Sequence, residues 1–356
     1  MKPINFLDTL SYYRQTLWPF IQKNLNQIKD LPQFCQLDKK YKNLLDFHFK
    51  MVTDYPCRQG KYLRPTLVLL TAQAMGFNSK LAAPTAAAMQ LSEDWILGHD
   101  DIEDQSLNRR GLPAIQKLYG NELAINAGDA LHNLTLNILS QNFSILDKKI
   151  AQTIQQEFFT MINRTIFGQT IEIKWTQENR FDLSEKDILL ILESKTGYYT
   201  IAGPMRLGAI LAGASALQLN SIYKFGQALG KSFQIIDDLL DLTSNFAGQK
   251  NQFGNDIYEG KRTIMLTHLL NNISSQNKPK LLTILKKSRA QKTEKEVLWV
   301  IDQMKETGSL DYSKNLADKF SVEAKKIFDT ELKFLSQKPF RSQLSAGIDF
   351  ITNRKY

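Results

Sequence analysis

Apolar residues three and four positions apart fill most of this chain, between prolines that stand far from one another. The pattern runs through segments of helix length, for example residues 67–74, 82–99, 122–139 and 188–199. Such spacing puts the apolar side chains on one face of an α-helix, whereas a half-buried strand would alternate apolar and polar residues. Strictly alternating segments are absent from the sequence, as are Asn-Gly and Asp-Gly hairpin signals. The sequence predicts an all-α fold, and because no segment resembles a linker, it predicts a single domain over residues 1–356.

Composition narrows the class of protein. Hydrophobic residues make up 43% of the chain and charged residues 23%, which is ordinary for a soluble protein. No apolar run reaches the ~20 residues that a membrane-spanning helix needs. The first residues lack the basic start, apolar middle and cleavage site of a signal peptide, and two cysteines, Cys35 and Cys57, are too few for a disulfide framework. We expect a cytoplasmic protein with no membrane span.

The net charge of +9 raises the question of a nucleic-acid or membrane partner. Lys and Arg are spread along the whole chain, however, and the densest run, residues 278–295, has no other distinguishing feature. A solvated basic surface is the simplest interpretation. Small phosphorylated substrates would also suit a basic protein, so charge alone does not decide the function.

One short pattern occurs twice. Residues 100–104 and 237–241 share the spacing Asp-Asp-x-x-Asp, and each copy follows an apolar helical stretch. Residues four apart on a helix lie about 40° apart around its axis, so the carboxylates of each cluster face nearly the same way. The two sets are Asp100, Asp101 and Asp104, and Asp237, Asp238 and Asp241.

Clustered carboxylates repel one another, and partial burial at the end of an apolar stripe increases that repulsion. A divalent cation removes it. Oxygen ligands without nearby His or Cys suit a hard ion, and Mg²⁺ binds through a few carboxylates plus substrate phosphates. The four histidines are scattered along the chain, which argues against zinc. One such cluster is common on acidic surface helices, but two copies after two apolar stripes indicate a magnesium site.

Basic residues accompany the clusters. Lys61 and Arg64 stand at a predicted helix start, after Gly60. A pair of arginines, Arg109 and Arg110, follows the first cluster by one short loop, expected over residues 106–113. Lys195 ends an apolar helical segment, and Lys261 follows directly after residues 256–260. Guanidinium and ammonium groups beside metal-loaded carboxylates are what a diphosphate needs, although each basic pair alone would more often be a solvated face.

These motifs, in this order, resemble the trans-isoprenyl diphosphate synthases of the polyprenyl synthetase family, which include the farnesyl and geranylgeranyl diphosphate synthases. The resemblance covers about residues 55–270 and rests on GKYLRP, HDDIEDQSLNRRG, KTG, FQIIDDLLD and GNDIYEGKRT. It implies a bundle of helices around a deep central cavity, usually in a homodimer. It also implies head-to-tail condensation of isopentenyl diphosphate with an allylic diphosphate, with release of pyrophosphate.

The resemblance also implies roles for individual residues. The six aspartates would hold Mg²⁺, three ions in each active site, on the allylic diphosphate. The residues that would contact this diphosphate are Arg109, Lys195, Gln234 and Lys261, and Thr196 would support its reacting end. Isopentenyl diphosphate would be bound by Lys61, Arg64 and Arg110. Metal and cations would stabilise the leaving diphosphate while a carbocation forms, and water must stay out of the site.

Two positions depart from the family pattern. The residue seven positions before Asp100 is usually Gln or His and touches isopentenyl diphosphate; here it is Glu93, about 20° from the Asp100 stripe. A carboxylate there would repel a diphosphate unless it is protonated or paired with a cation. The second departure is Asn251, at a position that usually carries Lys, with Lys250 one residue away.

Three alternative functions are open to a chain with these features. A terpene cyclase or head-to-head prenyl synthase would share the fold and the first acidic cluster, but a cyclase needs no second diphosphate site of the kind that Lys61 and Arg64 suggest. A non-catalytic partner subunit would be expected to have lost a motif aspartate. A nucleic-acid-binding helical protein would not need six clustered carboxylates, which repel phosphate.

Product length is expected to depend on residues just before the first cluster. Simple rotation places Ile96 on the Asp100 stripe, Ser92 about 80° away and Trp95 about 140° away, so helix geometry favours Ile96 as the cavity floor. In the family, an aromatic residue five positions before the motif limits the product. Trp95 has that position, which resembles geranylgeranyl diphosphate synthases and predicts a C20 product, with C15 or C25 next. The alternative is that Trp95 is a core residue.

Overall fold

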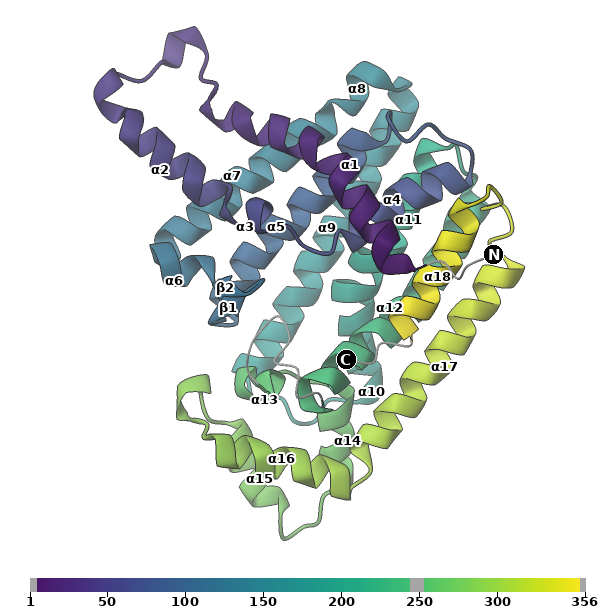
Figure 1. The fold of residues 1–356 in the computed structure, drawn as a ribbon. Coiled ribbons are helices and arrows are strands. Elements are labelled where there is room, and N and C mark those ends of the chain that lie inside the picture. The colour runs from purple at the N-terminus through teal and green to yellow at the C-terminus, as the bar shows by residue number, and fades with distance from the viewer. Residues whose placement is uncertain (1–4, 244–252, 353–356) are drawn as a thin grey trace. The chain divides into compact units, whose positions relative to one another are not determined.

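A computed structural model describes residues 5–243 and 253–352, most of them in helices (Figure 1). Its Cα packing divides the chain into two compact units, each built from three separate segments. The described residues of the first unit are 5–156, 204–214 and 335–346. Those of the second are 157–203, 347–352 and, as one segment of which residues 244–252 are not described, 215–334. The all-α prediction is confirmed, while the single domain remains a prediction.

The first unit is built largely from the N-terminal helices. They are α1 (Phe6–Asn26), α2 (Lys42–Val52), α3 (Asp54–Arg58), α4 (Leu63–Ala74), α5 (Ala83–Glu103), α6 (Ile115–Tyr119), α7 (Asn121–Ser140) and α8 (Asn142–Ile145), with short 3₁₀ turns at Gln27–Lys29, Gln33–Cys35 and Lys39–Tyr41. Helix α1 begins where the Asn5 side chain accepts a hydrogen bond from the Leu7 N–H, and it buries Leu10, Tyr13 and Leu17 at helical spacing. The N-cap and the packing of one apolar face therefore explain why a helix forms here.

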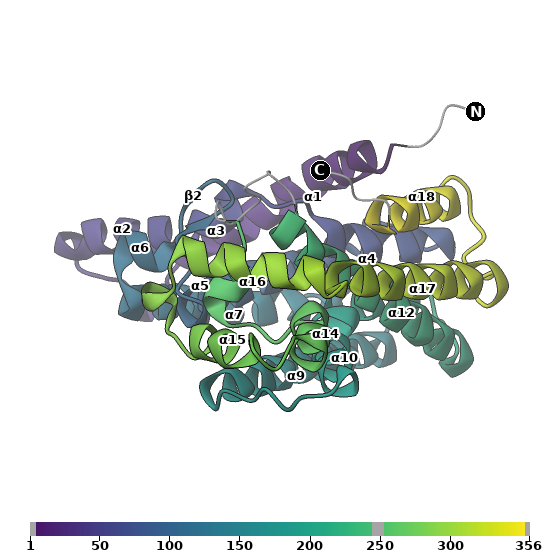
Figure 2. The ribbon, with the colours of Figure 1, turned by 90° about the horizontal axis from the view of Figure 1, so that it is seen from below.

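Helices α5 and α7 pack along each other, and both views of the fold show them together (Figures 1 and 2). Residues 84–92 of α5 are buried and rich in alanine, for example at residues 86–88, so neighbouring backbones can come close. Helix α7 contributes Leu131, Leu134 and Ile138 to the core. This packing fixes the direction of α5, which carries the first aspartate cluster at its C-terminal end.

The expected loop over residues 106–113 forms a short antiparallel hairpin of two strands. β1 (Asn108–Arg109) pairs antiparallel with β2 (Leu112–Pro113), and Arg110 and Gly111 form the turn with φ of 52° and 77°. Glycine adopts such left-handed values readily, whereas arginine does so at a cost. The tight turn holds Arg109 and Arg110 close to α5.

The second unit contains most of the remaining helices. Helix α9 (Lys148–Gln177) and α11 (Gly203–Leu211) are shared between the units, as is α18 (Phe340–Thr352); the others are α10 (Glu185–Ile191), the π-helix η4 (Leu192–Ala202), α12 (Ala216–Thr243), α13 (Asn255–Glu259), α14 (Ile264–Asn272), α15 (Lys278–Leu285), the 3₁₀ turn η5 (Arg289–Gln291), α16 (Glu294–Glu306) and α17 (Ser309–Thr330). Helix α12 packs against both η4 and α17, and Figures 1 and 2 label it and α17. It carries the second aspartate cluster.

Among the described residues, none of the helices is both long enough and apolar enough to cross a membrane. The cytoplasmic location stays a prediction of the sequence.

Candidate active site

The first aspartate cluster lies at the C-terminal end of α5. Asp100 and Asp101 belong to the last turn, and Asp104 is the C-cap, where its N–H donates to the Asp100 carbonyl at 2.8 Å. The last carbonyl groups of a helix lack intrahelical partners, and the helix dipole is negative at this end. Three carboxylates placed there add to that negative potential. The arrangement is unfavourable alone and favours binding of a cation.

Asp101 is fully buried and its carboxylate is engaged on both oxygens. The Nε of Arg109 donates to Oδ1 and Oδ2 at 3.0 Å each, and its Nη2 also donates to Oδ1. The hydroxyl of Tyr55 donates to Oδ2 at 2.5 Å. Arg109 Nη2 also lies 3.6 Å from Asp100 Oδ2. Asp101 therefore holds the Arg109 side chain in place, whereas Asp100 and Asp104 are partly exposed.

A set of residues that the sequence did not indicate supports this pair. Tyr55 accepts a hydrogen bond from the Ile115 N–H at 2.9 Å, so its hydroxyl bridges α6 and the cluster. Gln116 donates to the Asp101 carbonyl at 2.6 Å, and Arg58 donates to the Arg109 carbonyl at 2.9 Å. Tyr55, Gln116 and Arg58 lie 15 to 51 positions away from the residue of the pair that each contacts, and no local pattern marks them.

The residues predicted for isopentenyl diphosphate also lie in the first unit. Lys61 is exposed just before α4, and Arg64 lies in its first turn. Glu93 is paired with cations: Oε2 lies 3.1 Å from Arg64 Nη1, and Oε1 lies 3.5 Å from Arg110 Nη2. Asp94, which no sequence motif marks, pairs with Arg110 Nη1 at 2.8 Å. The carboxylate of Glu93 is thus paired with cations, which is one of the two conditions under which it would not repel a diphosphate.

The second cluster lies in the last two turns of α12, which ends at Thr243. Asp238 is buried and accepts a hydrogen bond from Gln234 Nε2 at 2.8 Å, and Gln234 Oε1 accepts one from the Thr196 hydroxyl at 3.0 Å. Burial raises the pKa of the Asp238 carboxyl well above its usual range, and the charges of Asp256 and then Asp237 raise it further. A bound cation would relieve both effects.

The predicted lysines of the second unit are each paired with a carboxylate. Lys195 Nζ lies 2.7 Å from Glu172 Oε2. Lys261 Nζ lies 3.1 Å from Asp256 Oδ1 and 3.0 Å from Glu259 Oε2. The two lysine side chains are therefore held in defined positions by three carboxylates that were not among the predicted site residues.

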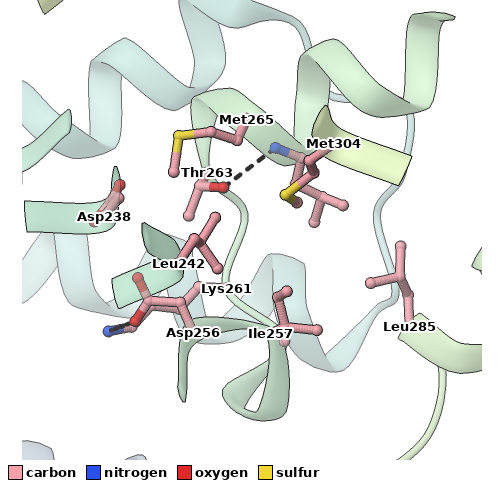
Figure 3. Close-up of a pocket in the computed structure, with 11 residues that line it drawn as sticks. Asp238, Leu242, Asp256, Ile257, Lys261, Thr263, Met265, Leu285 and Met304 are labelled. Carbon is pink, nitrogen blue, oxygen red and sulfur yellow. Dashed lines mark hydrogen bonds and ion pairs between the residues drawn. The ribbon is translucent and has the colours of Figure 1, made fainter. Parts of the chain in front are cut away.

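Asp241 is tied to the segment that begins α13. Its Oδ2 accepts a hydrogen bond from the Asp256 N–H at 2.9 Å, and its carbonyl accepts one from the Gly254 N–H at 2.9 Å. Figure 3 shows Asp256 and Lys261 joined beside a small cavity that Asp238 also lines. The volume of this cavity is about 10 Å³, the room that one water molecule needs.

The three residues proposed to set product length all lie on α5. Ser92 is fully buried, and its hydroxyl donates to the Met89 carbonyl at 2.8 Å. Trp95 is 6% exposed and packs on two histidine rings, with centroids 4.7 Å away for His132 of α7 and 5.7 Å away for His99. Ile96 is partly buried. The Trp95 ring thus contacts the neighbouring helix, as its role as a core residue requires.

Over residues 5–243 and 253–352, the structure contains no preformed group of three or more His, Cys, Asp or Glu side chains that could hold a metal ion. The donor chemistry still fits Mg²⁺. Carboxylates gather at two helix C-termini, and Mg²⁺ completes its coordination with water and substrate phosphates rather than with an all-protein cage. Asn251 and Lys250 lie outside the described residues.

Comparison with known proteins identifies the family to which the chain belongs. The family model described as polyprenyl synthetase matches residues 47–304. The chain is 32% identical over 299 residues to a geranylgeranyl diphosphate synthase of Methanosarcina mazei, covering 83% of this chain and 86% of that protein. It is 34% identical over 264 residues to a geranylgeranyl diphosphate synthase of Sulfolobus acidocaldarius, covering 73% and 77%.

A solved structure shows the same fold. It is the geranylgeranyl pyrophosphate synthetase of Pyrococcus horikoshii, which superposes with a TM-score of 0.77 at 24% identity and covers 96% of this chain and 100% of that one. The family model spans well over half of the present sequence, and the aspartate-rich helix ends lie within it. The chain therefore belongs to the polyprenyl synthetase family, and it is a trans-prenyltransferase of the isoprenyl diphosphate synthase class.

Proposed function

We propose that this enzyme condenses isopentenyl diphosphate with an allylic diphosphate, head to tail, in a reaction that depends on Mg²⁺. The observation that carries the proposal is the placement of both aspartate clusters at helix C-termini, where the helix dipole adds to their negative charge. Bound Mg²⁺ would neutralise charge on the leaving diphosphate. The likeness to relatives named as geranylgeranyl diphosphate synthases, together with Trp95 before the first cluster, supports a C20 product.

We assign each site residue to a metal ion, to one of the two diphosphates or to holding another site residue. Asp100, Asp104, Asp237 and Asp241 are assigned to the metal ions that meet the allylic diphosphate. Asp101 is assigned to holding Arg109, because both of its oxygens are engaged. The residues assigned to the allylic diphosphate itself are Arg109, Lys195, Thr196, Gln234 and Lys261, with Asp238 holding Gln234. Lys61, Arg64 and Arg110 are assigned to isopentenyl diphosphate.

Loss of one carboxylate from either cluster tests the Mg²⁺ proposal. Asp100→Ala and Asp237→Ala should each lower kcat by at least ~10²-fold, the scale seen when one element of electrostatic stabilisation is removed. Asp318→Ala, which removes an exposed carboxylate of α17, is the control. The assay combines Mg²⁺, isopentenyl diphosphate and each allylic primer, with products identified by mass spectrometry. Turnover close to that of the wild type in either cluster variant would refute the assignment, and cyclised or head-to-head products would refute the reaction.

We further propose that the two compact units form one domain and that the chain forms a homodimer. Each unit is assembled from three separated segments, whereas independent domains are usually continuous stretches of chain joined by exposed linkers. Large apolar side chains on α7, Ile125 at 45% exposure and Leu136 at 48%, support a partner surface. Light scattering should give twice the mass of the 40.8 kDa chain, and unfolding should follow a single transition.

A further inference from the structure

Glu93 lies between two arginines that the proposed function assigns to isopentenyl diphosphate. Its Oε2 is 3.1 Å from Arg64 Nη1, its Oε1 is 3.5 Å from Arg110 Nη2, and its side chain is 13% exposed. One carboxylate thus bridges two guanidinium groups, each of which could otherwise bind an oxygen of a phosphate.

Arg110 does not depend on Glu93 for its position. Its Nη1 donates to Asp94 Oδ1 at 2.8 Å and to the Tyr55 carbonyl at 2.8 Å, and Asp94 is 1% exposed. Gly60 leaves room for the guanidinium, since a Cβ there would lie 2.9 Å from Nη2. The Arg110 side chain would therefore stay in place if Glu93 moved away.

The contacts of Glu93 are looser than those of Asp94. In the part of the chain that the structure describes, Arg110 Nη2 and Glu93 Oε2 are both buried without a hydrogen-bond partner. Glu93 therefore interacts with Arg64 and Arg110 mainly through charge, with poor hydrogen-bond geometry. An anion with more oxygens and more charge, such as a diphosphate, could replace it on both guanidinium groups.

The charges of this group nearly cancel. Two carboxylates, Glu93 and Asp94, face two guanidinium groups, Arg64 and Arg110. An approaching diphosphate would meet a nearly neutral group, and its attraction to Arg64 and Arg110 would be opposed by repulsion from Glu93. A neutral amide in place of Glu93 would leave one net positive charge.

We propose that Glu93 occupies the place of a phosphate between Arg64 and Arg110 and competes with the diphosphate of isopentenyl diphosphate for both guanidinium groups. This inference rests on the proposed function. It makes Glu93 a specificity-determining residue that weakens binding of the homoallylic substrate without acting on the allylic one. Isopentenyl diphosphate must displace the carboxylate in order to bind.

Glu93→Gln tests the competition because it keeps the size of the side chain and removes its charge. The KM for isopentenyl diphosphate should fall at least tenfold, which corresponds to ~1.4 kcal/mol. The KM for the allylic substrate should stay within twofold. Glu93→Asp keeps the charge and should not reproduce the tenfold fall. Glu122→Gln, which neutralises an exposed carboxylate of α7 in the same unit, is the matched control.

Calorimetric titration with isopentenyl diphosphate alone provides a readout that needs no turnover. The dissociation constant should fall by the same factor in Glu93→Gln as the KM does. If wild-type protein forms prenyl product but Glu93→Gln binds isopentenyl diphosphate equally or less well, the competition is overturned and the proposed function stands. If neither protein binds isopentenyl diphosphate nor forms product with any allylic primer, the proposed function itself has failed.

Discussion

At the scale of single residues, the first acidic cluster depends on a buried tyrosine. Tyr55 is 1% exposed, and its hydroxyl both donates to Asp101 and accepts from the Ile115 N–H. Burial raises the pKa of Tyr55, and the nearby Asp101 charge raises it further, so the hydroxyl keeps its proton at any physiological pH. A proton that stays on the oxygen can serve as a permanent donor to the carboxylate. Tyr55 is therefore a positioning residue for Asp101 and, through it, for Arg109.

Replacing Tyr55 with Phe should show the size of this contribution. The change keeps the ring and leaves a buried carboxylate oxygen and a buried N–H each short of one partner, so the free energy of unfolding should fall by ~1–3 kcal/mol. Urea unfolding measures it. Tyr12→Phe, at a side chain that is 62% exposed, should leave stability unchanged. Equal stability of Tyr55→Phe and wild type would show that the hydroxyl contributes nothing to the cluster.

At the scale of secondary structure elements, the second cluster depends on how closely η4 approaches α12. A Cβ on Gly230 would lie 2.3 Å from the Gly197 Cα, and one on Gly226 would lie 2.5 Å from the Ala202 Cα. Such distances leave no room for a side chain at Gly226 or Gly230. One turn beyond Gly230, the Thr196 hydroxyl reaches Gln234, which in turn holds Asp238. The glycine contact therefore sets the positions of predicted substrate and metal residues.

Gly230→Ala should separate the two elements. We expect a loss of ~1–3 kcal/mol in unfolding free energy, as for overpacked cores, together with lower activity because the contact of Thr196 with Gln234 lengthens. Gly98→Ala is the matched control for stability. It is also inside a helix, but no described atom beyond the neighbouring backbone lies within 4 Å of its added methyl group, so the variant should gain ~0.5–1 kcal/mol. Similar unfolding curves for both variants would show that η4 and α12 can move apart freely.

The same elements show what the sequence could and could not predict. Periodicity identified a helix over residues 188–199, because apolar spacing is local, but the structure continues it from Leu192 as a π-helix. The wider turn is not encoded in that spacing. The π-helix lies where α9 and α12 approach it closely, α9 with Gly168 against Lys195 and α12 with Gly230 against Gly197. The residues in these two contacts are 27 and 33 positions apart in the sequence.

The candidate site also has a part that the sequence could predict and a part that it could not. The aspartate clusters could be found because their members are one to four positions apart on one helix. Their partners could not: Tyr55 precedes Asp101 by 46 positions, and Glu172 precedes Lys195 by 23. Asp256 is an intermediate case. It lies inside the motif GNDIYEGKRT, which could be recognised as a family signature from the sequence. The ion pair of Asp256 with Lys261, however, could be seen only in the folded structure. Sequence patterns thus predicted the charged groups, and tertiary packing decided which of them are paired.

At the scale of the whole molecule, product length is the property for which two competing predictions follow from the sequence. Trp95 is buried against the His132 and His99 rings, which favours a packing role. Its Nε1 is buried without a hydrogen-bond partner among the described residues, however, which is unusual for an indole chosen only to fill a core. The two roles are compatible, because a rigidly packed ring is a better barrier to a growing chain than a mobile one.

We therefore expect Trp95→Ala to lengthen the product beyond C20 and to lower stability by ~3–5 kcal/mol, since an indole is lost from a packed position. Mass spectrometry of the products and urea unfolding measure the two effects separately. Trp299→Ala removes the same side chain from α16, where it packs against a different core cluster, and should lower stability without changing the product. Trp95→Phe leaves a smaller ring and should give an intermediate distribution of lengths. A Trp95→Ala enzyme that is destabilised but still makes only the wild-type product would show that Trp95 is a core residue and that the barrier to chain growth lies elsewhere, with Ile96, on the same stripe as Asp100, the next position to replace.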